Sequence, residues 1–379
     1  MFDSQELRIG EDGSQDVGPL TEAVRWMRAE CDRMVGLPIN LDFDYRPLAD
    51  LLAVHGNNAG NPRVENEFRI DTKPFEVAVL DFFTALAGGD PSRVFGYLTS
   101  GGTESNIFAV WVARERHPDA VLYASAEAHY SFPKLARLLR MPYVTVRTRS
   151  DGTMDNTALV RELARHPGRA AVVAVTIGTT GRGAVDDLPG VRKALAAAQV
   201  ERGWVHCDAA FGGILAEFGD EAIPWNLASG ADSVAMSGHK VIGCPVPCGV
   251  VLVPEADVTI IRREGVAIGS DDDTITGSRD SLAPALLWYE LRGLGRSGLA
   301  EQVRQCHRTA AHAQRKLAEI GRNPTRARGG TIVLFDRPSK DFCHRWHLVR
   351  DEEHAALVVM PHVTERLVDT LCEELAASA

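Results

Sequence analysis

The chain has 379 residues, of which 45% are hydrophobic and 24% charged, as in ordinary soluble globular proteins. This length suffices for a large core and for two domains. The formal net charge of −10 argues against a protein that binds nucleic acid or an anionic membrane. No stretch has the roughly 20 apolar residues that span a bilayer, and residues 1–8 lack the apolar core of a signal peptide.

The seven cysteines are scattered and follow no disulfide framework, which is typical of reduced cytosolic thiols. Cys244 and Cys248 lie close in sequence, but no second Cys or His pair has zinc-site spacing, so we interpret both as packing residues. We therefore expect a cytoplasmic protein with no bound metal, no nucleic-acid partner and no membrane partner.

Residues 1–50 are expected to form a loose polar arm and a helix, because apolar residues recur at helical spacing over 22–34. The stretch 55–62, His-Gly-Asn-Asn-Ala-Gly-Asn-Pro, is rich in turn formers and short amides. It reads equally well as a surface loop or as a loop that presents amides to a substrate. In the second interpretation Asn57 and Asn58 contact the substrate.

From about residue 90 to residue 254, strand-like and helix-like segments alternate, which indicates a mostly parallel sheet covered by helices. Strands are expected at 94–99, 120–124, 143–147, 170–176, 204–208, 231–236 and 248–253. The segment 170–176 is apolar nearly throughout, as in a strand that is buried on both faces.

After residue 254 a polar loop at 268–279 precedes a different pattern. Long helices are expected at 283–294 and 299–320, strands at 330–335 and 356–360, and a last helix at 363–376. We therefore expect an α/β protein with an N-terminal arm and helix over 1–50, a large domain over 51–280 and a smaller α+β domain over 281–379.

The segment Ser237-Gly-His-Lys240 lies between the apolar stretches 231–236 and 248–253. Two prolines stiffen the loop that follows it, so this loop cannot be a regular helix. An amine on such a loop can be partly desolvated, which lowers its pKa and suits it to a Schiff base with pyridoxal phosphate. A lone lysine in this position would more often be a solvated loop residue.

A glycine turn, Ser100-Gly-Gly-Thr103, links the strand at 94–99 to a helical run over 107–116. Backbone N–H groups at such a turn and the helix dipole together favour a phosphate group, to which the Thr103 hydroxyl could add a contact. The turn matches neither a Walker loop nor a dinucleotide fingerprint, so by itself it is weak support for phosphate binding.

His129 and Asp208 each follow or end a predicted strand. The ring of His129 could stack on an aromatic cofactor, although a capped loop histidine is an equal alternative. A carboxylate at the end of a buried strand needs a partner, and the pyridinium nitrogen of pyridoxal phosphate would supply one for Asp208. The alternative for Asp208 is a helix N-cap. The small side chain of Ala210 would leave room for the ring.

His129, Thr180, Asp208 and Lys240 all fall at carboxyl ends of predicted strands. We therefore expect these residues to converge on one rim of the sheet. Chance brings four chemically matched groups to one rim far less often than it places any one of them.

On these residues the chain resembles the pyridoxal-phosphate-dependent group II amino-acid decarboxylases, and it is most similar to bacterial histidine decarboxylases and plant serine decarboxylases. The resemblance runs from about residue 37 to the C-terminus. Its motifs are Ser100-Gly-Gly-Thr-Glu-Ser-Asn106, Glu127-Ala-His-Tyr-Ser131, Thr176-Ile-Gly-Thr-Thr180, His206-Cys-Asp-Ala-Ala210 and Ser237-Gly-His-Lys-Val-Ile-Gly-Cys-Pro-Val-Pro-Cys-Gly249.

The resemblance implies a fold-type-I homodimer with shared active sites and pyridoxal 5'-phosphate as cofactor. Lys240 would form the Schiff base, His129 would stack on the ring and Asp208 would bind its nitrogen. The residues implied to hold the phosphate are Ser100, Gly101, Gly102, Thr103, Ser237 and His239. The resemblance also places Thr180 near the ring hydroxyl, Asp186 in support of the site, and the loop around Ser270 near the neighbouring subunit's cofactor.

The reaction implied is decarboxylation of a small or polar L-amino acid to its amine and carbon dioxide. The substrate amine would displace Lys240 to form an external aldimine, and the ring would accept the electrons of the broken bond as a quinonoid carbanion. Protonation of Cα and the return of Lys240 would then release the amine.

Two positions depart from the family pattern. Ala267 stands where the family has a tyrosine, which is a plausible proton donor to Cα, and Leu282 stands where the family has a histidine. These changes could redirect the carbanion toward oxidative deamination or carbon–carbon bond chemistry, or they could lie outside the chemistry altogether. A non-catalytic binding protein is a third hypothesis, against which the intact lysine, aspartate and histidine speak.

Overall fold

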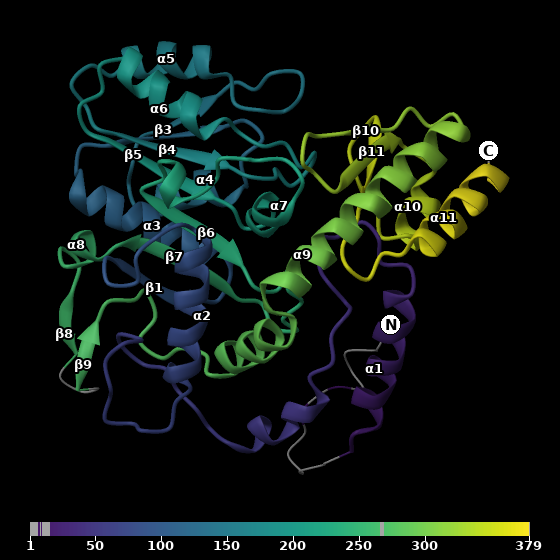
Figure 1. The fold of residues 1–379 in the computed structure, drawn as a ribbon, viewed down its shortest axis with the longest axis horizontal. Coiled ribbons are helices and arrows are strands. Elements are labelled where there is room, and N and C mark those ends of the chain that lie inside the picture. The colour runs from purple at the N-terminus through teal and green to yellow at the C-terminus, as the bar shows by residue number, and fades with distance from the viewer. Residues whose placement is uncertain (1–6, 8, 10–15, 266–268, 379) are drawn as a thin grey trace.

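A seven-stranded sheet forms the centre of the computed structural model, which describes residues 7, 9, 16–265 and 269–378 (Figure 1). Its strands lie in the order β1-β7-β6-β5-β4-β2-β3. The strands are β1 (Val94–Thr99), β2 (Val121–Ser125), β3 (Tyr143–Val146), β4 (Ala171–Thr176), β5 (Gly203–Asp208), β6 (Ser233–Ser237) and β7 (Gly249–Pro254).

Strands β2 to β6 pair in parallel, whereas β7 runs antiparallel to both of its neighbours, β1 and β6. The prediction of a mostly parallel α/β sheet is therefore confirmed, with β7 as the reversed strand. The register pairs Thr176 with Asp208, and it pairs Gly249 with both Thr99 and Ser237. The carboxyl ends of β1, β4, β5 and β6 therefore meet at one edge of the sheet.

Helices cover both faces of the sheet, which explains why its strands are apolar along their whole length. The helices of the chain are α1 (Gly18–Cys31), η1 (Arg46–Ala53), α2 (Lys73–Leu86), α3 (Gly102–Arg116), α4 (Ser131–Leu138), α5 (Asn156–Ala164), α6 (Leu188–Ala197), α7 (Gly212–Phe218), η2 (Leu227–Ser229), α8 (Glu255–Val258), α9 (Leu282–Glu319), α10 (Lys340–Arg345) and α11 (Glu365–Ala377). Side chains of α3, α4 and α8 form one core with the sheet, and those of α2, α5, α6 and α7 form the other.

Helix α9 joins the two parts of the molecule and bends at Gly295, whose φ of 61° and ψ of −175° are not helical. The sequence predicts two helices here, and the structure confirms two straight halves with Gly295 at the junction. The first half packs against α2, and the second packs against α11 and β11. This second part holds a four-stranded antiparallel sheet of β10 (Thr325–Arg326), β11 (Ile332–Asp336), β13 (His354–Val358) and β12 (Val349–Arg350).

The structure differs from the sequence-based expectation in several places: α3 begins at Gly102 rather than at residue 107, and β10, α10 and β12 were not expected. The polar loop at 268–279 contains β9 (Ser270–Asp272), which pairs with β8 (Arg263–Gly265) as a short hairpin. Helix α7 was not expected, because its Gly-Gly start reads locally as a turn. Among the described residues, no helix has the length and apolar character needed to cross a membrane.

The N-terminal helix α1 lies beside the C-terminal part of the chain in Figure 1. The His347 imidazole is 3.0 Å from the Glu30 carboxylate, and the Arg33 guanidinium lies over the Trp346 ring. No residue of α1 is buried, and Trp26 keeps 54% of its surface exposed. The predicted arm before α1 falls largely outside the described residues.

Candidate active site

A cavity of about 290 Å³ opens where β1, β4, β5 and β6 end. The structure brings to it every residue that the sequence singles out for the cofactor. These are Ser100, Gly101, Gly102, Thr103, His129, Thr180, Asp208, Ala210, Ser237, His239 and Lys240. Sequence reasoning gave no separate role to several further lining residues, namely Glu104, Asn106, Tyr130, Thr176, Gly178, Phe211 and Pro247.

Lys240 lies on a loop that backbone hydrogen bonds hold in place. The Gly238 N–H donates to the Cys248 carbonyl at 3.1 Å, and the Cys244 N–H donates to the Gly238 carbonyl at 3.2 Å. Burial in the cavity wall lowers the pKa of the Lys240 amine, while the nearby Asp208 carboxylate opposes this shift. Its surroundings therefore favour the neutral, nucleophilic amine more than bulk water does.

The N-terminus of α3 forms one end of the cavity. The first N–H groups of a helix have no partner within it, and the helix dipole makes this end positive. Gly102 allows a close approach, because a Cβ atom there would lie 3.3 Å from both the Ala210 Cβ and the Ser237 Oγ. The Nδ1 atom of His239 lies 2.7 Å from the Cys248 carbonyl oxygen and 3.0 Å from the Cys248 backbone nitrogen, which orients its ring beside this end.

Two buried hydroxyls in the cavity wall have no hydrogen-bond partner among the residues that the structure describes. They are the Ser237 Oγ and the Thr176 Oγ1, and both residues line the cavity. A buried hydroxyl without a partner is costly, so a polar ligand at this place would satisfy both groups. A phosphorylated aromatic cofactor meets the requirements of the hydroxyls, the glycine turn and the helix terminus together.

A buried chain of hydrogen bonds, which we call the relay, begins at Trp204 and ends at Asp208. The Trp204 Nε1–H donates to the Ser233 Oγ at 2.9 Å, and the Ser233 Oγ lies 2.9 Å from the His206 Nδ1. The His206 Nε2 lies 3.0 Å from the Asn106 Oδ1, and the Asn106 Nδ2 donates to the Asp208 Oδ2 at 2.9 Å.

The orientation of the Asn106 amide sets the direction of the bonds in the relay. Asn106 turns its NH₂ group toward Asp208 and its oxygen toward His206. His206 then donates from Nε2 and accepts at Nδ1 from the Ser233 hydroxyl. Complete burial lowers the pKa of His206 to about 4, which keeps the ring neutral as this pattern requires. The alternative of a helix N-cap is wrong, because Phe211 precedes α7 and Asp208 does not.

His129 points its ring into the same cavity. Its Nδ1 atom accepts from the Ser131 N–H at 3.2 Å and lies 2.8 Å from the Ser131 Oγ, which fixes the ring at the start of α4. Burial lowers the pKa of His129, and Lys240 adds to this effect while Asp208 opposes it. The neighbouring Tyr130 ring lies 4.1 Å away by centroid, and Tyr130, which also lines the cavity, is 69% exposed.

Asp186 supports the wall of the cavity from behind. Its carboxylate accepts hydrogen bonds from the Met154 N–H at 2.6 Å and from the Thr176 N–H at 2.9 Å. Complete burial raises the pKa of Asp186 to about 6. Through Thr176 this residue holds the end of β4, next to Thr180 and opposite Asp208.

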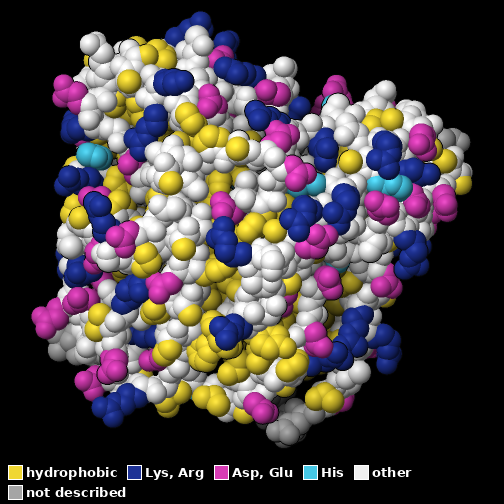
Figure 2. All heavy atoms as spheres, viewed as in Figure 1, with side chains coloured by type: hydrophobic (Ala, Val, Ile, Leu, Met, Phe, Trp, Pro, Cys, Tyr) yellow, Lys and Arg dark blue, Asp and Glu magenta, His cyan; other side chains and the backbone are white. Residues whose placement is uncertain are grey.

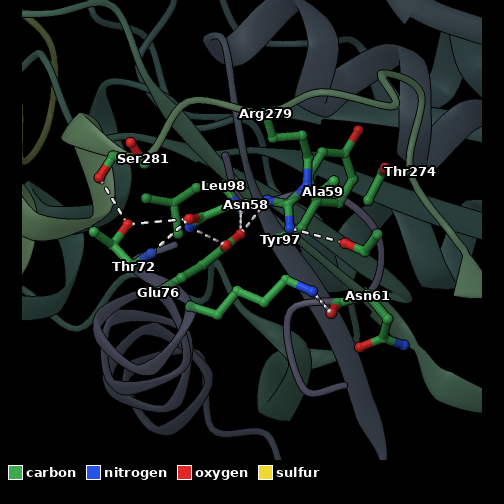
Figure 3. Close-up of polar contacts among 12 residues, drawn as sticks. Asn58, Ala59, Asn61, Thr72, Glu76, Tyr97, Leu98, Thr274, Arg279 and Ser281 are labelled. Carbon is green, nitrogen blue, oxygen red and sulfur yellow. Dashed lines mark hydrogen bonds and ion pairs between the residues drawn. The ribbon is translucent and has the colours of Figure 1, made fainter. Parts of the chain in front are cut away.

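Asn57 and Asn58 are not among the residues that line the cavity. Figure 3 shows Asn58 beside Thr72 and Glu76. The Asn57 Nδ2 donates to the Ser278 Oγ at 3.2 Å, and the Asn58 Nδ2 donates to the Glu76 Oε2 at 2.8 Å. Asn58 is completely buried, so the stretch 55–62 is not a simple surface loop either. The amides that the sequence marks for a substrate instead bind other parts of the same chain.

At the centre of Figure 3 lies a buried ion pair between Arg279 and Glu76. Their side chains are 3% and 0% exposed. Glu76 also accepts from the Leu98 N–H at 2.9 Å, and the Arg279 guanidinium donates to the Gly60 carbonyl at 2.9 Å. The pair thus joins α2, β1, the loop at 55–72 and the segment before α9.

Replacing Arg279 by methionine is expected to lower the free energy of unfolding by about 3–5 kcal/mol, because it leaves the Glu76 carboxylate buried without its cation. The matched control is Arg202→Met. Arg202 pairs with Asp119 at 2.8 Å, but the two side chains are 46% and 44% exposed. That loss should cost much less, because solvent screens an exposed ion pair. Urea unfolding of both variants measures the difference, and equal costs would contradict the importance of burial.

The two departures from the family pattern lie in different surroundings. Ala267 falls outside the described residues. Leu282 is the first residue of α9 and packs half-buried against the core, while Asp280 accepts a hydrogen bond from its N–H at 2.8 Å. Ser270 is 7% exposed in β9.

Comparison with known proteins places this cavity in a family. Residues 95–326 match the model of the pyridoxal-dependent decarboxylase conserved domain, and this span contains every predicted cofactor residue. The chain belongs to the pyridoxal-dependent decarboxylases. The cofactor is therefore pyridoxal phosphate, and the protein is an enzyme of the carboxy-lyase class rather than a non-catalytic binding protein.

Named relatives agree with this assignment, and solved structures agree with the fold. The chain is 37% identical to serine decarboxylase 3 of Oryza sativa subsp. japonica, over 91% of this chain and 78% of the relative. It is 36% identical to a histidine decarboxylase of Mesorhizobium japonicum, over 96% and 98% of the two chains. The fold is similar to that of L-methionine decarboxylase from Streptomyces sp. 590, with a TM-score of 0.91 at 24% identity over 100% of this decarboxylase and 98% of the other chain.

Proposed function

We propose that this decarboxylase removes the α-carboxylate of a small or polar L-amino acid of the histidine or serine type. The observation that carries the proposal is the meeting of Lys240, Asp208 and His129, from three separate strand ends, around one cavity. Relatives named serine and histidine decarboxylases, which cover nearly the whole chain, support this substrate class.

Pyridoxal phosphate supplies an aldehyde for a Schiff base and a ring that accepts the electron pair of the bond to the carboxylate. The chain contributes the groups around it. Lys240 offers an amine whose pKa is lowered by burial, and Asp208 offers a carboxylate that would hold a proton on the ring nitrogen. The α3 N-terminus, Ser237 and His239 would bind the phosphate, and His129 would cover one face of the ring.

The site also has to prefer loss of the carboxylate over other reactions at Cα. The relay through Asn106 holds Asp208 in place, so that Asp208 would keep a proton on the ring nitrogen of the bound cofactor, where that proton would favour electron withdrawal. His129 and Tyr130 also line the cavity, and Tyr130 is the more exposed of the two. Nothing in the relatives supports the alternative in which the carbanion is redirected.

A product screen tests the proposed function. The purified protein would be incubated with pyridoxal phosphate and a panel of L-amino acids, under air and under nitrogen. We expect amine and carbon dioxide in equal amounts with one histidine- or serine-like substrate, regardless of oxygen. Aldehyde and ammonia formed only under air would instead establish the redirected chemistry, and absence of product from every free amino acid would contradict the substrate class.

The enzyme is also proposed to be a homodimer in a reducing compartment. Figure 2 shows hydrophobic side chains gathered around the beginning of α9, between α2 and η1. Leu52 and Val54 are 78% and 58% exposed in the single chain, and Phe75 is 38% exposed. Such a patch is typical of a protein interface. Sedimentation at micromolar concentration should give twice the mass of one chain, whereas a single-chain species would refute the dimer.

A further inference from the structure

A segment far from the cavity motifs in sequence touches the loop that carries Lys240. This segment, residues 34–42 (the strap), follows α1 and precedes η1. It runs between the C-terminal sheet domain and the lysine loop, so it contacts both. No motif that the sequence singles out for the cofactor lies in it.

Asn40 makes the contacts between the strap and the lysine loop. Its backbone N–H donates to the Lys240 carbonyl at 3.1 Å. Its side-chain Nδ2 donates to the Val241 carbonyl at 3.0 Å and lies 3.5 Å from the Ile242 carbonyl. Asn40 is 2% exposed, so this one residue binds the carbonyls that follow the catalytic lysine in a site closed to water.

The lysine loop is shaped to receive Asn40. Gly243 has a φ of +92°, a conformation that residues other than glycine adopt rarely. A Cβ atom there would lie 3.0 Å from the Asn40 Nδ2. The Asn40 Oδ1 accepts a hydrogen bond from the Asp42 N–H at 2.9 Å, which fixes the orientation of the amide. Each polar atom of the Asn40 side chain is therefore used.

The other side of the strap is bound to the C-terminal sheet domain. The His362 Nδ1 accepts from the Leu41 N–H at 3.3 Å, and its Nε2–H donates to the Met34 carbonyl at 2.7 Å. The Val358 N–H of β13 donates to the Val35 carbonyl at 2.7 Å. The His362 imidazole thus binds both ends of the strap. Asn40, which precedes Leu41 in the strap, binds the lysine loop.

We propose that Asn40 is a positioning residue for Lys240, and that the strap links the main chain of Lys240 to the C-terminal domain through His362. The inference rests on the proposed role of Lys240 in binding the cofactor. Asn40 is not among the residues that line the cavity. It fixes the loop so that the Lys240 side chain enters the cavity from one direction, toward Asp208 and His129.

The test compares Asn40→Ala with the control Asn226→Ala in the full-length enzyme. Asn226 accepts hydrogen bonds from the Ser229 N–H at 3.0 Å and the Ser229 Oγ at 2.9 Å, away from the cavity. Two readouts are followed besides turnover: the rate at which pyridoxal phosphate attaches to the cofactor-free protein, and the pH midpoint of the bound cofactor's absorbance. Thermal unfolding shows whether each variant is folded.

For Asn40→Ala we expect attachment to slow about tenfold and the pH midpoint to shift, because the net loss of one or two hydrogen bonds corresponds to roughly that factor. The Asn226→Ala control should keep the wild-type rate and midpoint, although it should lose about as much stability as Asn40→Ala. His362→Ala should change the same two readouts in the same direction but less, because it frees the strap without touching the lysine loop.

A wild-type rate and midpoint in folded Asn40→Ala would overturn the inference. Should the alanine variant not fold, Asn40→Ser is measured instead and judged by the same criteria. Borohydride reduction distinguishes failure of the positioning role of Asn40 from failure of the proposed function. If borohydride fixes the cofactor on Lys240 of the wild-type enzyme while Asn40 variants behave as wild type, only the positioning role is lost. If it fixes no cofactor at Lys240, the proposed function itself fails.

Discussion

Replacing Lys240 by alanine is expected to abolish measurable decarboxylation, with a loss of at least about 10³-fold in kcat/KM. Lys240 is the one lysine that lines the cavity, among the described residues. Burial lowers the pKa of its amine, so the variant loses the neutral nucleophile at that place. The α3 N-terminus, Asp208 and Ser237 all remain, and we therefore expect the variant to keep binding pyridoxal phosphate without a covalent bond.

The measurement is carbon dioxide release, together with retention of the cofactor after borohydride treatment and denaturation. Lys240→Arg keeps the charge but cannot form the Schiff base, so it should be as inactive as Lys240→Ala. Lys316→Ala is the matched control, since Lys316 pairs on the surface with Glu319 at 3.6 Å and should leave turnover unchanged. Full activity of Lys240→Ala would refute the assignment of the Schiff-base lysine.

Asp208→Asn should lower kcat by about 10²- to 10³-fold while the protein stays folded. An amide of the same shape removes the carboxylate that is proposed to hold the ring-nitrogen proton, and one preorganised electrostatic contact in a buried site is worth roughly that factor. The change also conflicts with the relay, because the Asn106 NH₂ group now faces an amide instead of a carboxylate. We expect the absorbance of the bound cofactor to change together with kcat.

A carboxylate elsewhere in the chain provides the comparison. Asp155 is the N-cap of α5 and accepts from the Thr157 N–H at 2.9 Å and the Ala158 N–H at 3.2 Å. Asp155→Asn should cost at most about 1 kcal/mol of stability and leave kcat and the cofactor absorbance unchanged. If Asp208→Asn behaved in the same way, its role would be structural, and the assignment to the ring nitrogen would be wrong.

The sequence by itself determined the alternation of strands and helices and the position of the cavity. Each motif lies at the end of an apolar run, as Asp208 does at the end of β5 and Ser237 at the end of β6. The carboxyl ends of parallel strands meet at one edge, so local patterns were sufficient to bring Lys240, His129 and Asp208 together. Glycine turns and helix starts are likewise local, which is why the α3 terminus was found.

What only the tertiary structure decided depends on pairs that are far apart in the chain. The reversed direction of β7 depends on how the stiff loop after Lys240 turns back, and the apolar pattern of a strand is the same in either direction. The sequence suggested a substrate contact for Asn58, because a short amide can hydrogen-bond equally well to a ligand or to a side chain such as that of Glu76. Asn40 and Lys240 are separated by 200 positions, and a single sequence has no periodicity that marks such a contact. Burial and partners of polar groups are properties of the folded chain, so they appear only when distant segments are packed together.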